Sequence, residues 1–238
     1  MKTSAGGWIR VIAREGLFIV AWAVVLVIAV IFFTRDLSTV PRIILIVLAV
    51  DVLALILLFF RDPDRALAEN EDPDSVIVAP ADGLVVAVSD VDEIPYVGGP
   101  GKQLSIFLSI LDVHVNRIPA SGVIEQATYV PGEYLVAWHP KSSEKNERAE
   151  FVLRHVSGTR ILFRQIAGLI ARRVVYHIDA GSRVTAGERF GIMKFGSRMD
   201  VVVPEGIEFS VTKGDRVKAG VTVIARTGET MSESRRRP

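Results

Sequence analysis

Two short stretches decide the fold: Ala180-Gly-Ser-Arg-Val-Thr-Ala-Gly187 and, 33 residues later, Lys213-Gly-Asp-Arg-Val-Lys-Ala-Gly220. Five of their eight positions are identical, and each copy leads into an apolar segment, at residues 189–194 and 221–226. A solenoid would need more copies than two. The repeat therefore predicts two equivalent β-hairpin units within one domain.

Between the two copies lies Ile192-Met193-Lys194-Phe195, and this arrangement resembles the barrel-sandwich fold of biotinyl and lipoyl carrier domains. In that fold an exposed hairpin midway between the repeats presents the lysine that takes the cofactor. The resemblance implies a flattened, mainly β, barrel-sandwich-like domain of antiparallel sheets, with a hairpin at residues 194–198. It also implies an alternative function, a membrane-anchored carrier domain that is biotinylated or lipoylated on Lys194.

The N-terminal part of the chain holds two long apolar runs. Residues 17–33 are 17 apolar residues without a break, and residues 43–60 are 18 residues with one charge, Asp51. At about 1.5 Å per residue, such helices reach ~27 Å, close to the ~30 Å hydrocarbon core of a bilayer. We predict that residues 1–61 form a membrane anchor of two spanning helices, at about 17–33 and 43–60. A shallow hairpin in one leaflet is the alternative.

Charge indicates the orientation of this anchor. Five basic residues flank the hairpin and two lie in its loop: Lys2, Arg10, Arg14, Arg61 and Arg65, against Arg35 and Arg42. The positive-inside rule then places the C-terminal domain on the cytoplasmic side of the cell (inner) membrane. The net charge of +1 gives no electrostatic basis for binding nucleic acid. The chain has no cysteine, which excludes disulfides, thiolate catalysis and Cys-ligated metal sites.

The rest of the chain predicts one β-rich domain. A polar linker at residues 62–74 precedes it, and a polar tail at 227–238 follows it. Within residues 75–226, apolar strand-like segments alternate with turns rich in Gly and Pro. Besides the segments after the repeats, the expected strands lie at about 75–79, 84–88, 104–111, 123–130, 151–156 and 159–165.

A set of motifs across residues 60–226, together with the N-terminal hairpin, resembles phosphatidylserine decarboxylase in its short proenzyme form. Each motif alone is unspecific, and their order and spacing carry the resemblance. They are Phe60-Arg-Asp-Pro63, Ala79-Pro-Ala-Asp-Gly83, Leu111-Asp-Val-His-Val-Asn-Arg-Ile-Pro119, Asn146-Glu-Arg148, Gln165-Ile-Ala-Gly168, Ala171-Arg-Arg173 and Lys194-Phe-Gly-Ser-Arg198.

The resemblance implies a proenzyme that cleaves itself between Gly196 and Ser197. The large chain, 1–196, and the small chain, 197–238, would stay associated. Ser197 would become a pyruvoyl group, with no metal and no pyridoxal phosphate as further cofactor. That group would form a Schiff base with the serine headgroup amine of phosphatidylserine, release CO2 and give phosphatidylethanolamine. Gly196 has no side chain, which allows the close approach that cleavage requires.

The family's motifs also assign roles to individual residues. His114 would be the base that takes the Ser197 proton and later the proton donor, and Asp82 would orient His114. Longer family members carry a second histidine three residues after the first, and here that position is Arg117. Because arginine keeps its charge and can hold a phosphate or carboxylate, Arg117 becomes a candidate for binding the headgroup. The other substrate-binding candidates are Asn116, Arg172, Arg173 and Lys194.

The implied partners are phosphatidylserine and the membrane that contains it, and we also consider a homo-oligomer. A serine lipid with ether-linked isoprenoid chains presents the same headgroup, so archaetidylserine decarboxylase is a second alternative. A third class of protein, a non-catalytic membrane scaffold, predicts neither self-cleavage nor lysine modification.

Overall fold

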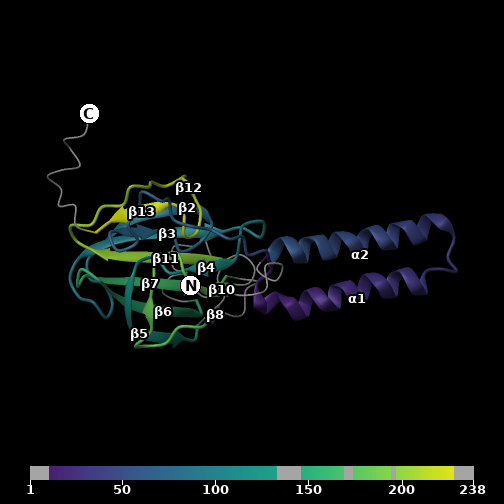
Figure 1. Ribbon diagram of the computed structural model, residues 1–238, viewed down its shortest axis with the longest axis horizontal. Coiled ribbons are helices and arrows are strands. Elements are labelled where there is room, and N and C mark those ends of the chain that lie inside the picture. Colours follow the sequence, from purple (N-terminus) through teal and green to yellow (C-terminus); the bar gives the residue numbers. More distant parts are fainter. Residues whose placement is uncertain (1–10, 133–145, 169–173, 194–196, 228–238) are drawn as a thin grey trace. The chain divides into compact units, whose positions relative to one another are not determined.

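The computed structural model in Figure 1 describes residues 11–132, 146–168, 174–193 and 197–227. Contacts divide the chain into two units, Met1–Asp64 and Arg65–Pro238. The first unit contains the helices and the second contains every described strand.

Two apolar helices, α1 (Leu17–Phe33) and α2 (Thr39–Phe59), lie side by side as a hairpin, and a short 3-10 turn, η2 (Arg14–Gly16), precedes α1. The spans Arg14–Phe33 and Thr39–Phe59 are long and apolar enough to cross a membrane, with mean hydropathies of 3.0 and 2.9. α2 begins earlier than the expected residue 43, because Pro41 lies in the first turn, where its missing N–H is not needed.

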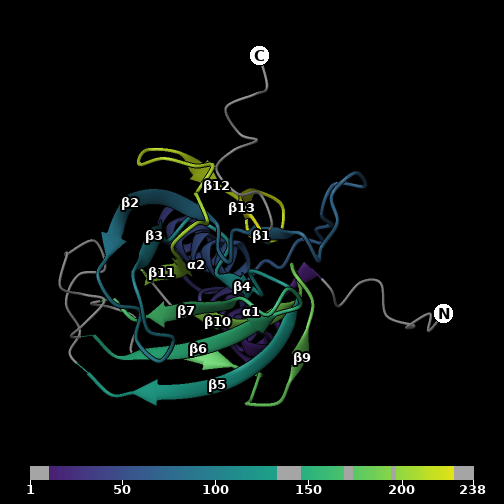
Figure 2. The same cartoon turned by 90° about the vertical axis from the view of Figure 1, so that its left-hand side faces the viewer.

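An eight-stranded antiparallel sheet forms the main part of the second unit and curves into a half-barrel (Figure 2). Its strand order is β12-β2-β3-β11-β7-β6-β5-β9. The strands are β2 (Gly83–Val91), β3 (Gly101–Leu108), β5 (Gly122–Val130), β6 (Arg148–His155), β7 (Arg160–Ile166), β9 (Arg183–Val184), β11 (Ser197–Pro204) and β12 (Arg216–Val217). The prediction of a mainly antiparallel β domain is confirmed.

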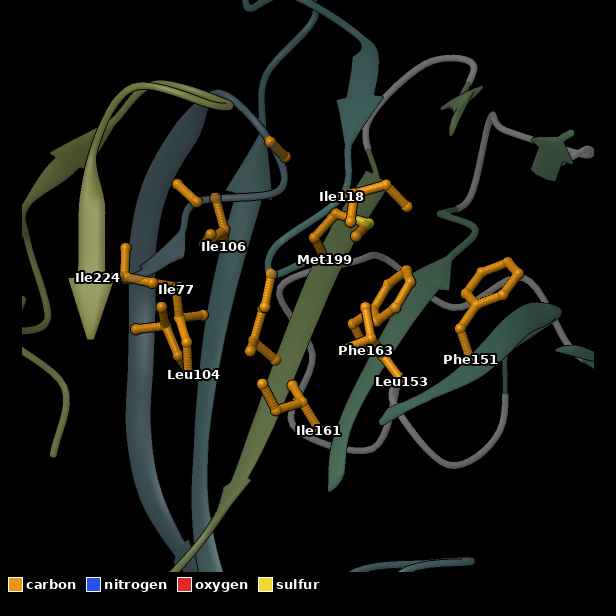
Figure 3. Close-up of a cluster of buried hydrophobic side chains, with 14 of the residues drawn as sticks. Ile77, Leu104, Ile106, Ile118, Phe151, Leu153, Ile161, Phe163, Met199 and Ile224 are labelled. Carbon is orange, nitrogen blue, oxygen red and sulfur yellow. The ribbon is translucent and has the colours of Figure 1, made fainter. Parts of the chain in front are cut away.

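Two smaller sheets complete the domain. One pairs β1 (Val76–Val78) with β13 (Val223–Arg226), and the other has the order β4-β10-β8, formed by β4 (Val115–Arg117), β10 (Arg189–Met193) and β8 (Val174–Tyr176). Buried side chains from all three sheets form one core, part of which Figure 3 shows. Its largest members include the stacked rings of Phe151 and Phe163, 4.9 Å apart, with Phe190 edge-on to both.

The sequence repeat corresponds to a structural repeat. The Arg-Val pairs of the two copies form β9 and β12, which lie at opposite edges of the large sheet. β9 pairs with the first two residues of β5, and β12 pairs with the first two residues of β2. A register shift follows in both places, between β2 and β3 and between β5 and β6. The two equivalent Gly-rich units are present, but they are not β-hairpins, because β10 and β13, the next strands after β9 and β12, lie outside the large sheet in the two smaller sheets.

This repeat extends to two halves of the domain. The first half comprises β1, β2, β3, β11, β12 and β13, and the second half comprises β4, β5, β6, β7, β9 and β10. Strands at equivalent places pair in the same way, and β11 and β7 join the halves at the centre of the sheet. The second half is continuous in sequence, whereas the first half is interrupted between β3 and β11 by the whole second half.

β10 and β11 do not pair with each other, which corrects the hairpin expected at residues 194–198. β10 pairs with β4 and β8, whereas β11 pairs with β3 and β7. The reason is that β10 ends the second half while β11 resumes the first half. The segment between them therefore connects two different sheets.

Candidate active site

Ser197 is the first residue of β11 and lies opposite Leu108 of β3. The residue is fully buried, and within the described part of the chain its Oγ has no hydrogen-bond partner. Most buried side-chain hydroxyls are hydrogen-bonded, and the exceptions occur often at sites with a catalytic role. The structure thus distinguishes Ser197 from an ordinary serine in a turn.

His114 lies immediately before β4 and is also fully buried. Its backbone carbonyl accepts a hydrogen bond from the N–H of Met193, the last residue of β10, at 3.2 Å. Its Nδ1 lies 2.9 Å from the backbone oxygen of Asp112. Because a carbonyl oxygen can only accept, Nδ1 carries the proton in the neutral ring and Nε2 keeps its lone pair. This is the tautomer in which Nε2 can act as a base.

Asp82 lies in the turn between β1 and β2, and its partners differ from the one expected. Arg65 Nη2 donates to Oδ2 at 2.7 Å, Arg65 Nη1 donates to Oδ1, and the N–H of Ala219 donates to Oδ1 at 2.8 Å. The two side chains are only 12% and 13% exposed. The structure does not bring Asp82 to His114, whose ring is held by the Asp112 carbonyl, so the orienting role of Asp82 stays a prediction.

Arg117 lies on β4 with its guanidinium directed to the ends of the two repeats. Nη1 donates to the backbone oxygen of Gly187 at 2.8 Å. A Cβ added at Gly220 would lie only 2.7 Å from Arg117 Cδ, so glycine is required where this side chain passes. These contacts support a packing role for Arg117, and its binding of a headgroup stays a prediction.

Asn116, one of the predicted substrate-binding residues, forms a buried amide pair with Gln165, which was not among the predicted site residues. Gln165 Nε2 donates to Asn116 Oδ1 at 2.8 Å, and both residues are fully buried. Within the described residues, Asn116 Nδ2 and Gln165 Oε1 have no partner. Gly191 pairs with Asn116, and a Cβ there would lie 3.0 Å from Gln165 Nε2, so Gly191 makes room for the pair.

This amide pair lies close to Ser197 in the sheet. Gln165 of β7 is opposite Met199 of β11, two residues beyond Ser197 and therefore on the same face. The pair connects the large sheet with β4, the strand that His114 precedes. The signal for Gln165 in the sequence was its place at the start of the motif Gln165-Ile-Ala-Gly168.

Arg198 and Asp200, on the opposite face of β11, fix the position of the strand that Ser197 begins. Arg198 Nε donates to Asp200 Oδ1 at 2.6 Å, and Nη2 donates to Ser105 Oγ at 2.5 Å. All three residues are buried. These contacts hold the backbone next to Ser197 independently of the covalent link to residue 196.

The ion pairs continue across the same face of the sheet. Arg164 lies opposite both Asp200 and Glu150, and Glu150 contacts Arg148 at 2.7 Å and Arg164 at 3.1 Å. Burial alone would raise the pKa of Glu150, but the hydrogen bond from Arg148, the charge of Arg164 and the Tyr96 hydroxyl together lower it. The hydrogen bond to Glu150 in turn raises the pKa of Tyr96.

Four of the predicted site residues, Lys194, Gly196, Arg172 and Arg173, lie outside the described residues, and their roles stay predictions. Within the described ranges no group of three or more His, Asp or Glu residues is placed to hold a metal ion. His114 is hydrogen-bonded to Met193, the last residue of β10, and Ser197 is the first residue of β11, so both lie next to the ends of these two strands. The hydrogen bond between Gln165 and Asn116 joins the same two sheets.

The sequence matches the phosphatidylserine decarboxylase family over residues 52–225. A phosphatidylserine decarboxylase proenzyme of Salinibacter ruber is 56% identical over 182 residues, which cover 76% of this chain and 80% of the relative. Proenzymes of the same name from Cytophaga hutchinsonii and Symbiobacterium thermophilum are 40% and 43% identical. These alignments cover 89% and 91% of this chain, and 94% and 95% of the relatives.

Proposed function

The chain belongs to the phosphatidylserine decarboxylase family of carboxy-lyases, and we propose that it cleaves itself at Gly196/Ser197 and converts phosphatidylserine to phosphatidylethanolamine. The observation that carries the proposal is Ser197, a buried serine at the start of a central strand whose hydroxyl has no partner among the described residues. A buried hydroxyl that is not hydrogen-bonded to any described residue is available for reaction. The relatives' name, proenzyme, supports processing of the chain.

Self-cleavage and formation of the pyruvoyl group require only groups of the chain itself and one water molecule. Ser197 Oγ attacks the carbonyl carbon of Gly196, so that a C–O bond forms and the peptide C–N bond breaks. His114 Nε2 takes the hydroxyl proton and returns it to the amine that leaves. Elimination then removes the α-proton of residue 197 and releases the carboxylate of Gly196. Addition of water to the remaining residue expels ammonia and leaves the pyruvoyl carbonyl.

The surroundings of Ser197 fit such a group. When present, the pyruvoyl group would supply a carbonyl that condenses with the headgroup amine and accepts the electrons that CO2 leaves behind. Asn116 Nδ2 can donate to the carboxylate of a serine headgroup, and Gln165 Oε1 can accept from its amine. His114 is the candidate to return a proton to the product.

The two apolar helices support a membrane location for this activity. A diacyl lipid leaves the bilayer at a cost of about 0.8 kcal/mol per CH₂, so an enzyme acting on its headgroup works best at the membrane surface. We propose that residues 1–61 anchor the chain in the inner membrane and that the catalytic domain lies on the cytoplasmic side.

The proposal is tested on the purified full-length protein by a denaturing gel, intact mass and CO2 release from phosphatidylserine. We expect two chains cut between Gly196 and Ser197, the smaller with a blocked N-terminus. An intact chain with biotin or lipoate on Lys194 would establish the carrier function instead, and an intact unmodified chain would indicate a scaffold. Turnover of only ether-linked isoprenoid serine lipids would assign archaetidylserine as the substrate.

A further variant tests the base. His114→Gln keeps a side chain that can donate to the Asp112 carbonyl but has no ring nitrogen to accept a proton. We expect cleavage to slow by about 100-fold or more, the usual contribution of a general base. An unchanged rate of cleavage would remove His114 from the mechanism.

A further inference from the structure

The turn at residues 109–112 carries large apolar residues at its tip. The N–H of Asp112 donates to the Ser109 carbonyl at 3.0 Å, which closes the turn. The two central residues, Ile110 and Leu111, are 41% and 63% exposed. Turn tips normally carry Gly, Pro, Asn, Asp or Ser, because these residues favour turn geometry or bond their own backbone. The isoleucine and leucine side chains here leave much of their apolar surface exposed.

Side-chain contacts hold this turn in place. Asp112 Oδ2 accepts a hydrogen bond from the N–H of Ser109 at 2.8 Å, and Oδ1 accepts one from Arg216 Nη1 at 3.1 Å. The Arg216 side chain is 69% exposed. The exposed cation thus neutralises the acidic side chain of the turn, so that Asp112 does not repel an anionic surface, and the apolar tip is held in a fixed conformation.

The turn is part of the candidate active site's surroundings. It starts directly after Leu108, the residue opposite Ser197, and ends two residues before His114. The tip is therefore at the end of the sheet where Ser197 lies. A ligand that contacts Ile110 and Leu111 is close to the reacting group.

We infer that the 109–112 turn is a lipid-contact turn, whose Ile110 and Leu111 side chains enter the surface of a bilayer that contains anionic lipid. The inference rests on the proposed function, because the substrate is then an anionic lipid whose headgroup must reach Ser197. Two side chains are too small an area for a stable protein interface, but suit shallow insertion by a domain that the chain already anchors in the membrane. The helices keep the domain at the bilayer, and the turn sets which end of the sheet faces it.

Val156 provides a matched control. It is 58% exposed and directly follows β6, as the turn directly follows β3. Because β3 and β6 run in opposite directions in the sheet, Val156 lies at the end remote from Ser197. If lipid contacts the 109–112 turn, we therefore expect no lipid contact at Val156.

The first experiment measures insertion without reference to activity. The chain has no cysteine, so Leu111→Cys and Val156→Cys each accept a single environment-sensitive fluorophore. The labelled full-length proteins are reconstituted in phosphatidylserine vesicles with or without brominated acyl chains. We expect bromine to quench the label at 111 by about twofold or more and to leave the label at 156 unchanged, because shallow insertion reaches ~5–10 Å into the interface. Equal quenching of the two labels overturns the inference. Shielding of the label at 111 together with crosslinking between two copies of the chain also overturns it.

The second experiment separates lipid contact from catalysis. The double variant Ile110→Ser/Leu111→Ser and the control Val156→Ser are assayed on long-chain phosphatidylserine in vesicles and on monomeric short-chain phosphatidylserine. We expect the double variant to lose about tenfold in kcat/KM on vesicles and little on the monomeric substrate, since two apolar contacts are lost only at the bilayer. Equal losses on both substrates would contradict lipid contact. Failure of the proposed function is distinct, since the parent protein would then be uncut and inactive on either substrate.

Discussion

The two halves of the catalytic domain share hydrogen bonds that hold their turns, but they differ in their buried polar residues. In the turn before β2, Asp82 accepts a hydrogen bond from the N–H of Ala219 at 2.8 Å. In the turn before β5, Ser121 accepts one from the N–H of Ala186 at 3.2 Å. Ala186 and Ala219 occupy the same position in the two copies of the repeat. This hydrogen bond between the turn and the repeat is therefore present in both halves, although the accepting residues differ.

The strands β1 and β4 differ in residue type and not only in the residues that make a shared bond. They occupy equivalent places, yet Ile77 and Val78 of β1 are apolar where β4 has Asn116 and Arg117. Buried polar groups are costly without full hydrogen bonding, and the fold demonstrably works with apolar residues at this place. Arg117 bonds to the Gly187 carbonyl and so has a packing role, whereas Asn116 has no such role, and we therefore predict that Asn116 is kept for function.

Replacing Ser197 should have the largest effect. Ser197→Ala is expected to leave an uncut and inactive chain, because no other group at this position can attack the Gly196 carbonyl. The matched control is Ser121→Ala, a buried serine whose Oγ donates to the Pro73 carbonyl at 2.9 Å. That variant should lose about 1 kcal/mol of stability and still be cut. Intact mass and thermal unfolding measure both results, and normal processing of Ser197→Ala would refute the mechanism.

Making β4 resemble β1 should have the next largest effect. Asn116→Ile places in β4 the residue that β1 has at Ile77, and leaves the Gln165 amide without its partner. We expect a loss of about 100-fold in decarboxylation, as for loss of one preorganised donor, and of about 1–3 kcal/mol in stability.

Adding Gln165→Leu to Asn116→Ile sharpens this result. Replacing both members of a buried hydrogen-bonded pair by apolar residues is often nearly neutral for stability. The double variant should therefore recover stability in denaturant unfolding while remaining inactive on phosphatidylserine. If activity returned together with stability, the amide pair would have only a structural role.

Giving the first half the turn residue of the second half should have a moderate effect. Asp82→Ser can still accept from the Ala219 N–H, but it leaves Arg65 without its carboxylate. We expect a loss of about 2 kcal/mol, between the values for an exposed pair and for a fully buried pair, because both side chains keep some exposure. Arg65→Met in the same chain should restore most of it. A rate of self-cleavage equal to that of the parent would remove Asp82 from the mechanism, whereas a marked slowing would support its predicted role.

The smallest effect concerns His155, which by register occupies in β6 the place that Leu108 has in β3. Burial lowers the pKa of His155 from its usual 6.5, and Asp74 offsets this only in part. The unfolded chain therefore binds a proton that the folded chain does not, so stability is lost as pH falls below 6.5. His155→Gln should weaken this acid dependence without changing self-cleavage. An identical slope of stability between about pH 7 and 5 would contradict it.

The sequence predicted elements whose signals are local. The helices follow from uninterrupted apolar runs, and the repeat follows from identical residues such as Gly187 and Gly220. The hairpin expected at 194–198 came from the resemblance to carrier domains, and it is wrong because β11 pairs with strands of both halves but not with β10. Arg65 lay in a segment assigned to a linker, and only the tertiary fold brings it to Asp82. Gln165 gave no periodic signal, because Arg160 and Arg164 interrupt the apolar pattern of the same strand.

If the chain is cut before Ser197 as proposed, the position of β11 determines how the two products separate and refold. This strand lies in the middle of the large sheet between β3 and β7, and it begins with Ser197. Once the chain is cut before Ser197, the fragment that contains β11 leaves only if the sheet opens at its centre. The uncut chain refolds as one molecule, at a rate independent of concentration. The cut protein unfolds into two molecules, so its recovery becomes bimolecular and dependent on dilution.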